Sequence, residues 1–526
     1  MDIRKAIKGS FLFNLIIGLK KLSDNSFLFR LQSKTDNKRK HKPEEYKTWM
    51  DISFIYMFFM NLDNRLMRME EFIFQSLMTS RILSPFIKVK REKTDVQTPI
   101  RDNSYLYKII RKIKGKGSWL DLLIFIPASY FVIDFVIRRT RGLAVLGSVW
   151  DELALIVLTL YIIAKRLLSG GKIKHNFTPM DLPAIIYIVM GICHVLIIAP
   201  NLGIAIEGFR AVFQHILWYF IATQFIRSIE DSERVINLML SIGLFMGIHA
   251  VYQYIARVPM PGNWVDTTEN IRTRAFSIVG SPNILGVIFV LFIPIAISMF
   301  LTHKNKYMKI FYFCTTGFMT LGLLLTLSRG AWLAFALAMF IFIIALNPRL
   351  IVPFMAFVGI FILFGGSLSQ RLLFMLSPVY LVKSAAGGRL YRWDIGIKMW
   401  HRNRLFGVGL GRFGGAVAIN NQLAPFYLDN YYLKTLTEMG VYGIVGLAFV
   451  IICFIISSIK IIKYQNDTKN RIVAIGLFSG AMGVLAQNFV ENIFEVPAMI
   501  IYFWIAVALI NTFAPQHIVN GKGALK

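Results

Sequence analysis

Several arginines stand where apolar segments of the sequence begin or end, a position from which they can bind an anion at a membrane surface. Arg329 separates two long apolar runs. A guanidinium buried there costs about 2.5–3.5 kcal/mol on insertion scales, so it calls for a partner. Arg274 and Arg210 lie beside other apolar runs, and Arg389 opens an amphipathic stretch. The forked donors of arginine suit phosphate oxygens, although each of these side chains could instead extend to lipid headgroups.

The elements that must position these arginines are membrane helices. The chain has 526 residues, of which 56% are hydrophobic and only 17% charged, and a helix needs about 20 apolar residues to cross a bilayer. The continuous runs predict an all-α membrane protein of about 12 transmembrane helices and exclude an alternating β-barrel pattern. The predicted spans lie near 119–137, 144–164, 182–199, 205–226, 235–255, 283–301, 308–327, 330–347, 350–366, 440–462, 472–489 and 497–513.

The basic residues of the short loops predict the orientation of these spans. With the N-terminus in the cytoplasm, the lysines near 165–174, 304–309 and 460–469 and the tail 516–526 all lie inside, as the positive-inside rule requires. Arg138, Arg139 and Arg141 are the exception, because they would lie outside. We therefore expect both termini in the cytoplasm.

Residues 1–117 form a separate basic region with a net charge of about +13. Its two apolar patches, Phe11–Leu19 and Ile52–Leu62, are too short to span a membrane. Such a segment suits the surface of an anionic inner leaflet, and a solvated basic tail is the alternative. The basic residues form no recognisable nucleic-acid-binding module, so no nucleic-acid partner is expected.

One connection is far longer than the others. Residues 367–436 separate the ninth and tenth predicted spans and fall on the outer side, and loops of this length are usually functional. Leu390, Trp393, Ile397 and Trp400 repeat at helical spacing within it. This pattern predicts a helix in the membrane interface, with its tryptophans at headgroup depth.

Four motifs in the chain resemble those of the bacterial O-antigen ligase/O-antigen polymerase superfamily. Residues 274–286 (RAFSIVGSPNILG, with Asn283) resemble the signature RAFG-x-x-GNPN-x-x-G, and residues 327–332 (LSRGAW) resemble SRGAW. The run from Gly388 through Trp393 to LFGVGLGRF, with Gly407, Gly409 and Gly411, resembles GR-x-x-W and LFGVGLGNF. Asp429, Asn430, Leu433, Glu438 and Gly440 resemble HN-x-x-L-x-x-x-x-E-x-G. The resemblance covers residues 120–515, and the domain boundaries predicted are 1–117, 118–515 and 516–526.

The resemblance implies a GT-C-like glycosyltransferase of the inner (cytoplasmic) membrane that acts on its outer face. Such enzymes take a glycan from an undecaprenyl-diphosphate-linked oligosaccharide donor and join it to a glycan or lipid-glycan acceptor, with no cofactor, metal or nucleotide sugar. Arg329, Arg274, Arg210 and Arg389 would then bind the diphosphate, whose negative charge grows as the glycosidic bond breaks. The glycines of residues 405–414 would let the loop backbone approach a phosphate or another segment.

The acceptor hydroxyl of this chemistry needs a base. The family's ligases carry a histidine where this chain has Asp429, a departure that favours a polymerase of surface polysaccharide over a ligase. Glu438 is a second candidate base, and His401 could replace the missing histidine. The alternative for Asp429 is structural, because Asp429 or Asn430 could be the N-cap of the next helix.

Two other classes of function remain open. A multi-pass transporter or flippase of lipid-linked oligosaccharide would also have about twelve spans, but two-fold repeats with broken helices would be expected and the sequence shows none. A membrane scaffold would leave the arginines at span ends unexplained. The sequence GLGRFG at 409–414 matches G-x-G-x-x-G without a preceding strand, so it predicts no dinucleotide site.

Overall fold

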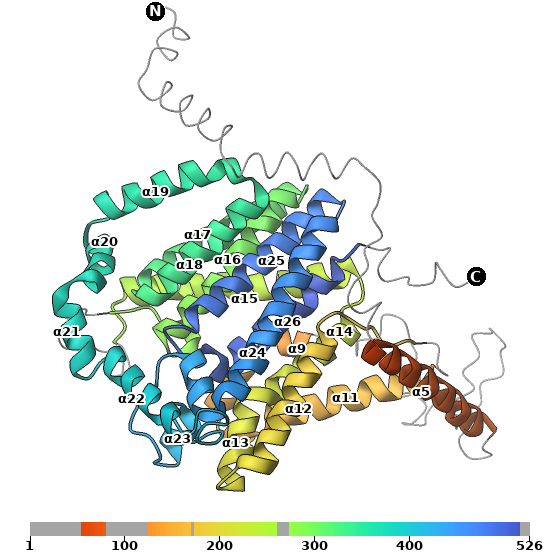
Figure 1. Ribbon diagram of the computed structural model, residues 1–526. Helices are drawn as coiled ribbons and strands as arrows, with labels where there is room; N and C mark the ends of the chain where they lie inside the picture. The colour runs from red at the N-terminus through yellow and green to blue at the C-terminus, as the bar shows by residue number, and fades with distance from the viewer. Residues whose placement is uncertain (1–53, 80–124, 170–172, 260–272, 516–526) are drawn as a thin grey trace, which may run out of the picture.

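The computed structural model describes residues 54–79, 125–169, 173–259 and 273–515, and within these ranges it is helical with no β-strand. Figure 1 shows the longer helices packed side by side as a bundle, with the first part of the long connection at residues 367–436 curving around one side of it. The predicted all-α membrane architecture is therefore confirmed in its coarse form.

The centre of the bundle is α16 (Pro282–Thr302), which is apolar on all sides and is surrounded by protein. Residues 287–293, 295 and 296 of this helix are at most 1% exposed, and Pro294 between them is also buried. Its main neighbour is α25 (Thr468–Gln487), where Gly476, Gly480 and Gly483 let the two backbones approach closely. A Cβ atom at Gly480 would lie 2.3 Å from the carbonyl oxygen of Leu291. Small residues of this kind drive helix association in membranes, where apolar surface alone gives no preference for protein over lipid.

Among the residues that the structure describes, seven helices are long and apolar enough to cross a membrane, against about twelve spans predicted for the chain. They are α12 (Asp181–Ile198), α15 (Ile229–Ile255), α16, α17 (Lys306–Leu325), α18 (Arg329–Leu346), α24 (Tyr431–Tyr464) and α25. An eighth span is possible by the same criteria if α19 (Ile351–Phe364) and α20 (Gly366–Leu373), which are bent by 96° between them, count as one.

The remaining predicted spans are helical, but each is short, charged or interrupted. The run 205–226 divides into α13 (Leu202–Phe213) and α14 (Leu217–Phe225) at a 3-10 turn. The run 119–137 divides into α9 (Phe125–Ala128) and α10 (Tyr130–Arg139), and its first residues lie outside the described ranges. α11 (Trp150–Leu168) carries acidic residues in its first turn and basic residues in its last. α26 (Pro497–Thr512) has only 16 residues. Hydropathy averaged over a window of about 20 residues does not detect such interruptions.

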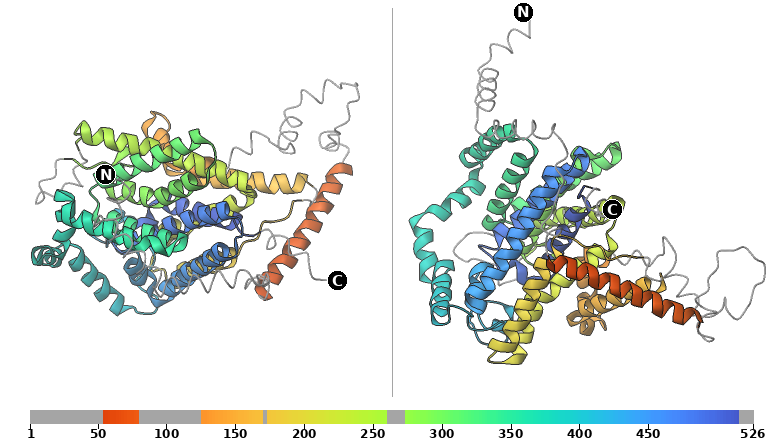
Figure 2. Two further views of the ribbon diagram at one scale, coloured as in Figure 1. Left: turned by 90° about the horizontal axis from the view of Figure 1, so that it is seen from above. Right: turned by 45° about the vertical axis from the view of Figure 1, so that its right-hand side comes forward.

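The outer connection folds into α20, α21 (Pro378–Ala386), α22 (Arg389–Arg402) and α23 (Ala416–Asn420). Figure 2 shows these helices along the side of the bundle from two further directions. The predicted amphipathic helix is α22. Leu390 and Ile397 are exposed as expected, whereas the Trp393 indole donates to the Leu428 carbonyl at 3.1 Å and packs in a small internal cluster with Phe413. The face predicted for lipid is thus divided between the surface and the loop itself.

In the N-terminal region, α5 (Phe54–Thr79) includes most of the predicted apolar patch at residues 52–62. The patch Phe11–Leu19 and the rest of residues 1–53 and 80–124 lie outside the described ranges.

A break in α24 provides the docking point for residues 404–414, which we call the glycine loop. Gly440 has φ 65° and ψ −160°, so the helical hydrogen-bond ladder stops there and backbone groups on both sides lose their partners. The glycine loop supplies new partners on both sides of the break. The bonds are Val408 N to Thr437 O (3.0 Å), Gly409 N to Glu438 O (2.9 Å), Val441 N to Arg404 O (2.9 Å) and Tyr442 N to Leu405 O (3.0 Å).

Replacing Gly440 by alanine should therefore weaken the fold. The new Cβ atom would lie 2.4 Å from the backbone of Leu405, and φ is positive, so we expect a loss of about 1–3 kcal/mol or more. Gly317→Ala is the matched control, because it lies inside α17 with no atom within 4 Å of the new group. That control should be neutral or slightly stabilising. The measurement is the thermal unfolding midpoint of the purified protein in detergent, and equal midpoints for the two variants would contradict this role of Gly440.

Candidate functional site

The turn between α17 and α18 anchors two arginines from distant parts of the chain. Leu327 has a positive φ of 52°, and the turn leaves carbonyl groups without helical partners. The Arg274 Nε atom donates to the Thr326 carbonyl at 2.8 Å, and the Arg371 Nε atom donates to the Leu327 carbonyl at 3.1 Å. The turn therefore fixes both guanidinium groups beside Arg329, which is the first residue of α18.

Arg274 is joined to Arg389 through an amide and a carboxylate. The Arg274 Nη2 atom donates to Asn283 Oδ1 at 3.0 Å, which links the two ends of the motif at 274–286. Asn283 Nδ2 donates to Glu491 Oε1 at 2.6 Å. The same Glu491 oxygen forms an ion pair with Arg389 Nη2 at 3.1 Å. Glu491 thus holds two of the predicted arginines together from the connection between α25 and α26.

Tyr380 of α21 interacts with both Arg389 and Arg329. The guanidinium carbon of Arg329 lies 5.1 Å from the centre of the Tyr380 ring, a cation–π contact. The Tyr380 hydroxyl also acts on Arg389, where it helps to raise the pKa. We call the four residues Arg274, Arg329, Arg371 and Arg389, together with Asn283, Glu491 and Tyr380, the arginine ring.

Asp429 lies beside the arginine ring and pairs with a fifth arginine. Its Oδ2 atom accepts from Arg392 Nη1 at 2.7 Å, and its backbone has a positive φ of 53°. The N-cap of α24 is the next residue, because the Asn430 side chain accepts from Leu433 N at 3.0 Å. Asp429 and Asn430 were both predicted as possible N-caps of this helix. The structure shows that Asn430 is the N-cap of α24, so the Asp429 carboxylate does not have that role.

Burial and neighbouring charges act on the carboxylates in opposite directions. Burial raises the pKa of Glu491 to about 7, against the lowering effect of Arg389 and Arg274, while the negative charge of Asp429 adds to the rise. Burial likewise raises the pKa of Asp429, and Arg389 and Arg392 counteract it. For Arg389, the pKa is raised because Glu491, Asp429 and Tyr380 outweigh the effect of burial.

Helix N-termini add to the positive potential at this place. Arg329 begins α18, Arg389 begins α22, and Asn283 is the second residue of α16. Asp429 lies two residues before the start of α24. The N-terminal end of a helix carries a partial positive charge and favours a bound anion. Five arginines and several helix N-termini therefore surround two carboxylates, an arrangement suited to an anion of more than one charge.

Glu438, the second candidate base, lies in a different cluster. It is 1% exposed, its Oε1 atom accepts from Phe413 N at 3.1 Å, and its Oε2 atom pairs with Lys434. Lys434 also pairs with Glu495 Oε1 at 2.9 Å. The Oε1 atom thus holds the glycine loop on α24, while the Oε2 atom is paired within α24 itself.

The glycines of the predicted motif approach protein segments closely. A Cβ atom at Gly407 would lie 2.5 Å from the backbone of Glu438, and one at Gly411 would lie 2.7 Å from the carbonyl oxygen of Ile204. Gly208 of α13 faces Gly411 in turn, since a Cβ atom there would lie 2.5 Å from Gly411 N. The glycines were predicted to let the loop backbone approach either a phosphate or another segment of the chain. The structure shows the close approach to another segment.

Two further candidates have partners outside the arginine ring. Arg210 of α13 pairs with Glu152 of α11 and hydrogen-bonds Gln214. His401 hydrogen-bonds the Ile397 carbonyl of its own helix. It lies twelve residues beyond Arg389, about 18 Å along α22.

Sequence reasoning missed Glu491, Arg371, Arg392, Lys434 and Glu495. A signal for Glu491 and Glu495 did exist. Two acidic residues follow an apolar helix within eight residues, in an outer connection that has no lysine or arginine. Because buried arginines need counter-ions, such an acidic connection is where those counter-ions could have been sought.

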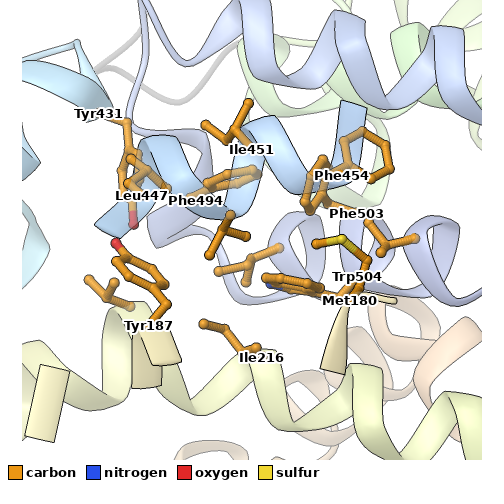
Figure 3. A pocket seen from close by; sticks show the side chains of 14 residues that line it. Met180, Tyr187, Ile216, Tyr431, Leu447, Ile451, Phe454, Phe494, Phe503 and Trp504 are labelled. Atoms are coloured by element: carbon orange, nitrogen blue, oxygen red, sulfur yellow. The ribbon is translucent and has the colours of Figure 1, made fainter. Parts of the chain in front are cut away.

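An apolar cavity lies between α12, α24 and α26 (Figure 3). The hydroxyl groups of Tyr187 and Tyr431 face each other at one end of it, and the other labelled side chains are hydrophobic. The lining residues include no charged side chain. In the described ranges, no three His, Cys, Asp or Glu side chains are grouped so that they could hold a metal ion.

Residues 314–448 match the family model described as O-antigen ligase. The match confirms the resemblance to the O-antigen ligase/polymerase superfamily and supports a membrane function of that type. The matched range holds Arg329, Arg371, Arg389, Arg392 and Asp429, while Arg274, Asn283 and Glu491 lie outside it. A search of the curated proteins finds no match to the chain.

Proposed function

We propose that this chain, with its O-antigen ligase domain at residues 314–448, is a glycosyltransferase of the cytoplasmic membrane that uses a polyprenyl-diphosphate-linked glycan as donor. The glycan is moved to an acceptor hydroxyl on the outer face of the membrane, as a repeat unit in a polymerase of surface polysaccharide. The observation that carries the proposal is the arginine ring, in which arginines from distant parts of the chain gather at several helix N-termini.

The charges at the site suit a diphosphate. Arg274, Arg329, Arg371, Arg389 and Arg392 gather there around the carboxylates of Asp429 and Glu491. A diphosphate that is esterified at both ends carries about two negative charges at neutral pH. Bidentate guanidinium contacts stabilise such an anion most as its charge grows, which is when the sugar departs.

The reaction assigned to these residues is a balanced displacement. The acceptor oxygen attacks the anomeric carbon of the donor glycan, and a new glycosidic C–O bond forms. The old bond between that carbon and the diphosphate oxygen breaks, and the diphosphate leaves with the electron pair, held by the arginine ring. Asp429 takes the proton of the acceptor hydroxyl, since its carboxylate adjoins the ring and its pKa is raised by burial.

The orientation proposed puts the arginine ring outside. α16 begins at the ring with Asn283, and the connection after its other end contains Lys304 and Lys306. α24 begins beside Asp429 and has Lys460 and Lys463 near its other end. The positive-inside rule therefore supports a cytoplasmic position for the lysine end. We propose that the shorter helices complete a GT-C-like bundle of about twelve segments, with both termini in the cytoplasm.

The experiment that tests the function is transfer from a purified polyprenyl-diphosphate oligosaccharide in proteoliposomes. Formation of longer glycan with release of the lipid diphosphate is the expected result. Elongation without another acceptor indicates a polymerase, and transfer only to an added lipid-glycan indicates a ligase. Movement of intact donor across the bilayer without transfer would support a flippase and overturn the proposal.

Arg329→Ala should lower transfer about 10²–10³-fold, because one of the groups that stabilises the leaving diphosphate is removed. Arg329→Lys should restore little activity, since a point charge does not reproduce forked contacts or stack on Tyr380 in the same way. Arg234→Ala is the control, because that side chain is 71% exposed at the start of α15 and should leave transfer unchanged. Wild-type activity in the Arg329→Ala protein, at equal membrane abundance, would leave this residue as a headgroup anchor.

Asp429→Asn should lower the rate by about 10²–10⁴-fold if the carboxylate is the base. The change also breaks the pair with Arg392, so Arg392→Gln serves as the matched variant that breaks the same pair from the other side. We expect Arg392→Gln to cost much less than Asp429→Asn, and Asp429→His to keep partial activity. Equal losses in Asp429→Asn and Arg392→Gln, measured as initial rates of chain elongation, would show that Asp429 acts only through Arg392.

Glu491 should make donor binding depend on pH. Its ionised form competes with the diphosphate for Arg274 and Arg389, and its pKa is about 7. The donor KM of the wild type should therefore rise with pH above about 7, by at most about tenfold per unit. Glu491→Gln cannot ionise, so its donor KM should be low and flat between pH 6 and 8, a range set by that pKa. An unchanged slope in the Gln variant would remove Glu491 as the competing anion.

A further inference from the structure

Helix α5 is held on α11 by one arginine, at a place distant in sequence from the arginine ring. Arg166 Nη2 pairs with Asp63 Oδ1 at 2.8 Å, and Arg166 Nε pairs with Glu70 Oε1 at 2.9 Å. All three side chains are between 11% and 14% exposed. Asp63 and Glu70 are seven residues apart and share one face of the helix. The contact therefore fixes which face of α5 points toward α11 and which faces point away.

A stripe of large apolar side chains lies on another face of α5. Its members follow each other at intervals of three or four residues and are 39–72% exposed. They are Phe58, Leu62, Leu66, Met69 and Phe72. We call them the α5 stripe. Around the helix, Arg65 falls among the members of the stripe and Arg68 at its edge, whereas Asn64 and Glu71 fall on the side away from it. Exposing an apolar stripe of this length to water is unfavourable, so we expect lipid or another protein surface to bury it.

The neighbouring surface of α11 is also apolar and uncovered by protein. Leu153, Ile156, Val157, Leu160 and Ile163 are 48–60% exposed on it. In Figure 1, α5 extends away from the end of α11 and crosses the general direction of the bundle helices. The α5 stripe thus lies near the apolar surface of α11, and apolar surfaces of this kind contact the bilayer in membrane proteins. Lys165 and Arg166, in the last turn of α11, belong to the basic end that the positive-inside rule places in the cytoplasm.

We infer that α5 lies on the cytoplasmic leaflet, with the α5 stripe among the lipids and an anionic headgroup surface as its partner. The charge of the region selects this occupant: residues 1–117 carry a net charge of about +13. Each lysine or arginine near an anionic leaflet strengthens binding to it, whereas two copies of so basic a segment repel each other. Arg166 sets the depth and rotation of the helix. The inference does not rest on the proposed glycan transfer.

The test uses the full-length chain in lipid nanodiscs, with Cys193, Cys314 and Cys453 replaced by serine and one spin label introduced at a time. Labels at Leu62, Met69 and Phe72 should collide with dissolved oxygen and be shielded from an aqueous nickel chelate. Labels at Asn64 and Glu71, the matched controls on the same helix, should show the reverse. Chelate access at all five positions would place the stripe in water. Shielding of the stripe from both reagents would identify a protein partner, such as a second copy, and either outcome overturns the inference.

Two further comparisons test the charge and the tether. Nanodiscs containing phosphatidylglycerol should give deeper stripe labels than nanodiscs of phosphatidylcholine alone, and high salt should reduce the difference. Equal depth in both lipids would overturn the anionic partner. Arg166→Gln should weaken the alternation between stripe and control positions, because the face of α5 is no longer fixed. An unchanged alternation would overturn the role given to Arg166.

Discussion

A guanidinium group cannot lie unpaired in an apolar membrane boundary, and this constraint shapes the site. Removing a charge from water costs several kcal/mol even after relaxation, so clustered arginines must share acceptors while no ligand is bound. The structure supplies backbone carbonyls from the α17–α18 turn to Arg274 and Arg371, and the Glu491 carboxylate to Arg389. These acceptors hold the guanidinium groups in fixed positions, where a bound anion could contact several of them together.

The connection between α25 and α26 joins this site to the glycine loop. Glu491 reaches the arginine ring, while Asn492 Oδ1 accepts from Asn430 N at 3.1 Å and Asn492 Nδ2 donates to the Gly414 carbonyl at 2.7 Å. Glu495 pairs with Lys434. One short segment therefore positions the ring, the start of α24 and the glycine loop together. A displacement of the glycine loop from the break at Gly440 would be transmitted to Asp429 through the backbone of Asn430.

Local patterns predicted only part of the candidate site, and pairing between distant segments determined the partners of those residues. Arg274 and Asn283 belong to the motif at 274–286 and are nine residues apart, so their hydrogen bond lies within that motif. Glu491 is more than two hundred residues from Asn283, so no spacing rule connects them. Glu438 and Asp429 were equivalent as acidic residues in a sequence, and only the fold separates the one enclosed with Lys434 from the one beside Arg392. Hydropathy found the central helices but could not detect the turn that divides 205–226.

The two carboxylates near the ring respond differently when the proposed donor binds. Arg389 lowers the pKa of Asp429, as Arg392 does, and both oppose the effect of burial. A diphosphate that engages Arg389 would cancel part of that lowering and add negative charge close to Asp429. The pKa of Asp429 would then rise, and the carboxylate would become a stronger base while the donor is in place. Glu491, displaced from Arg389 by the same diphosphate, would lose its counter-ion and take up a proton, since its pKa is already about 7. Donor binding would thus prepare the base and neutralise the competing anion through one guanidinium group.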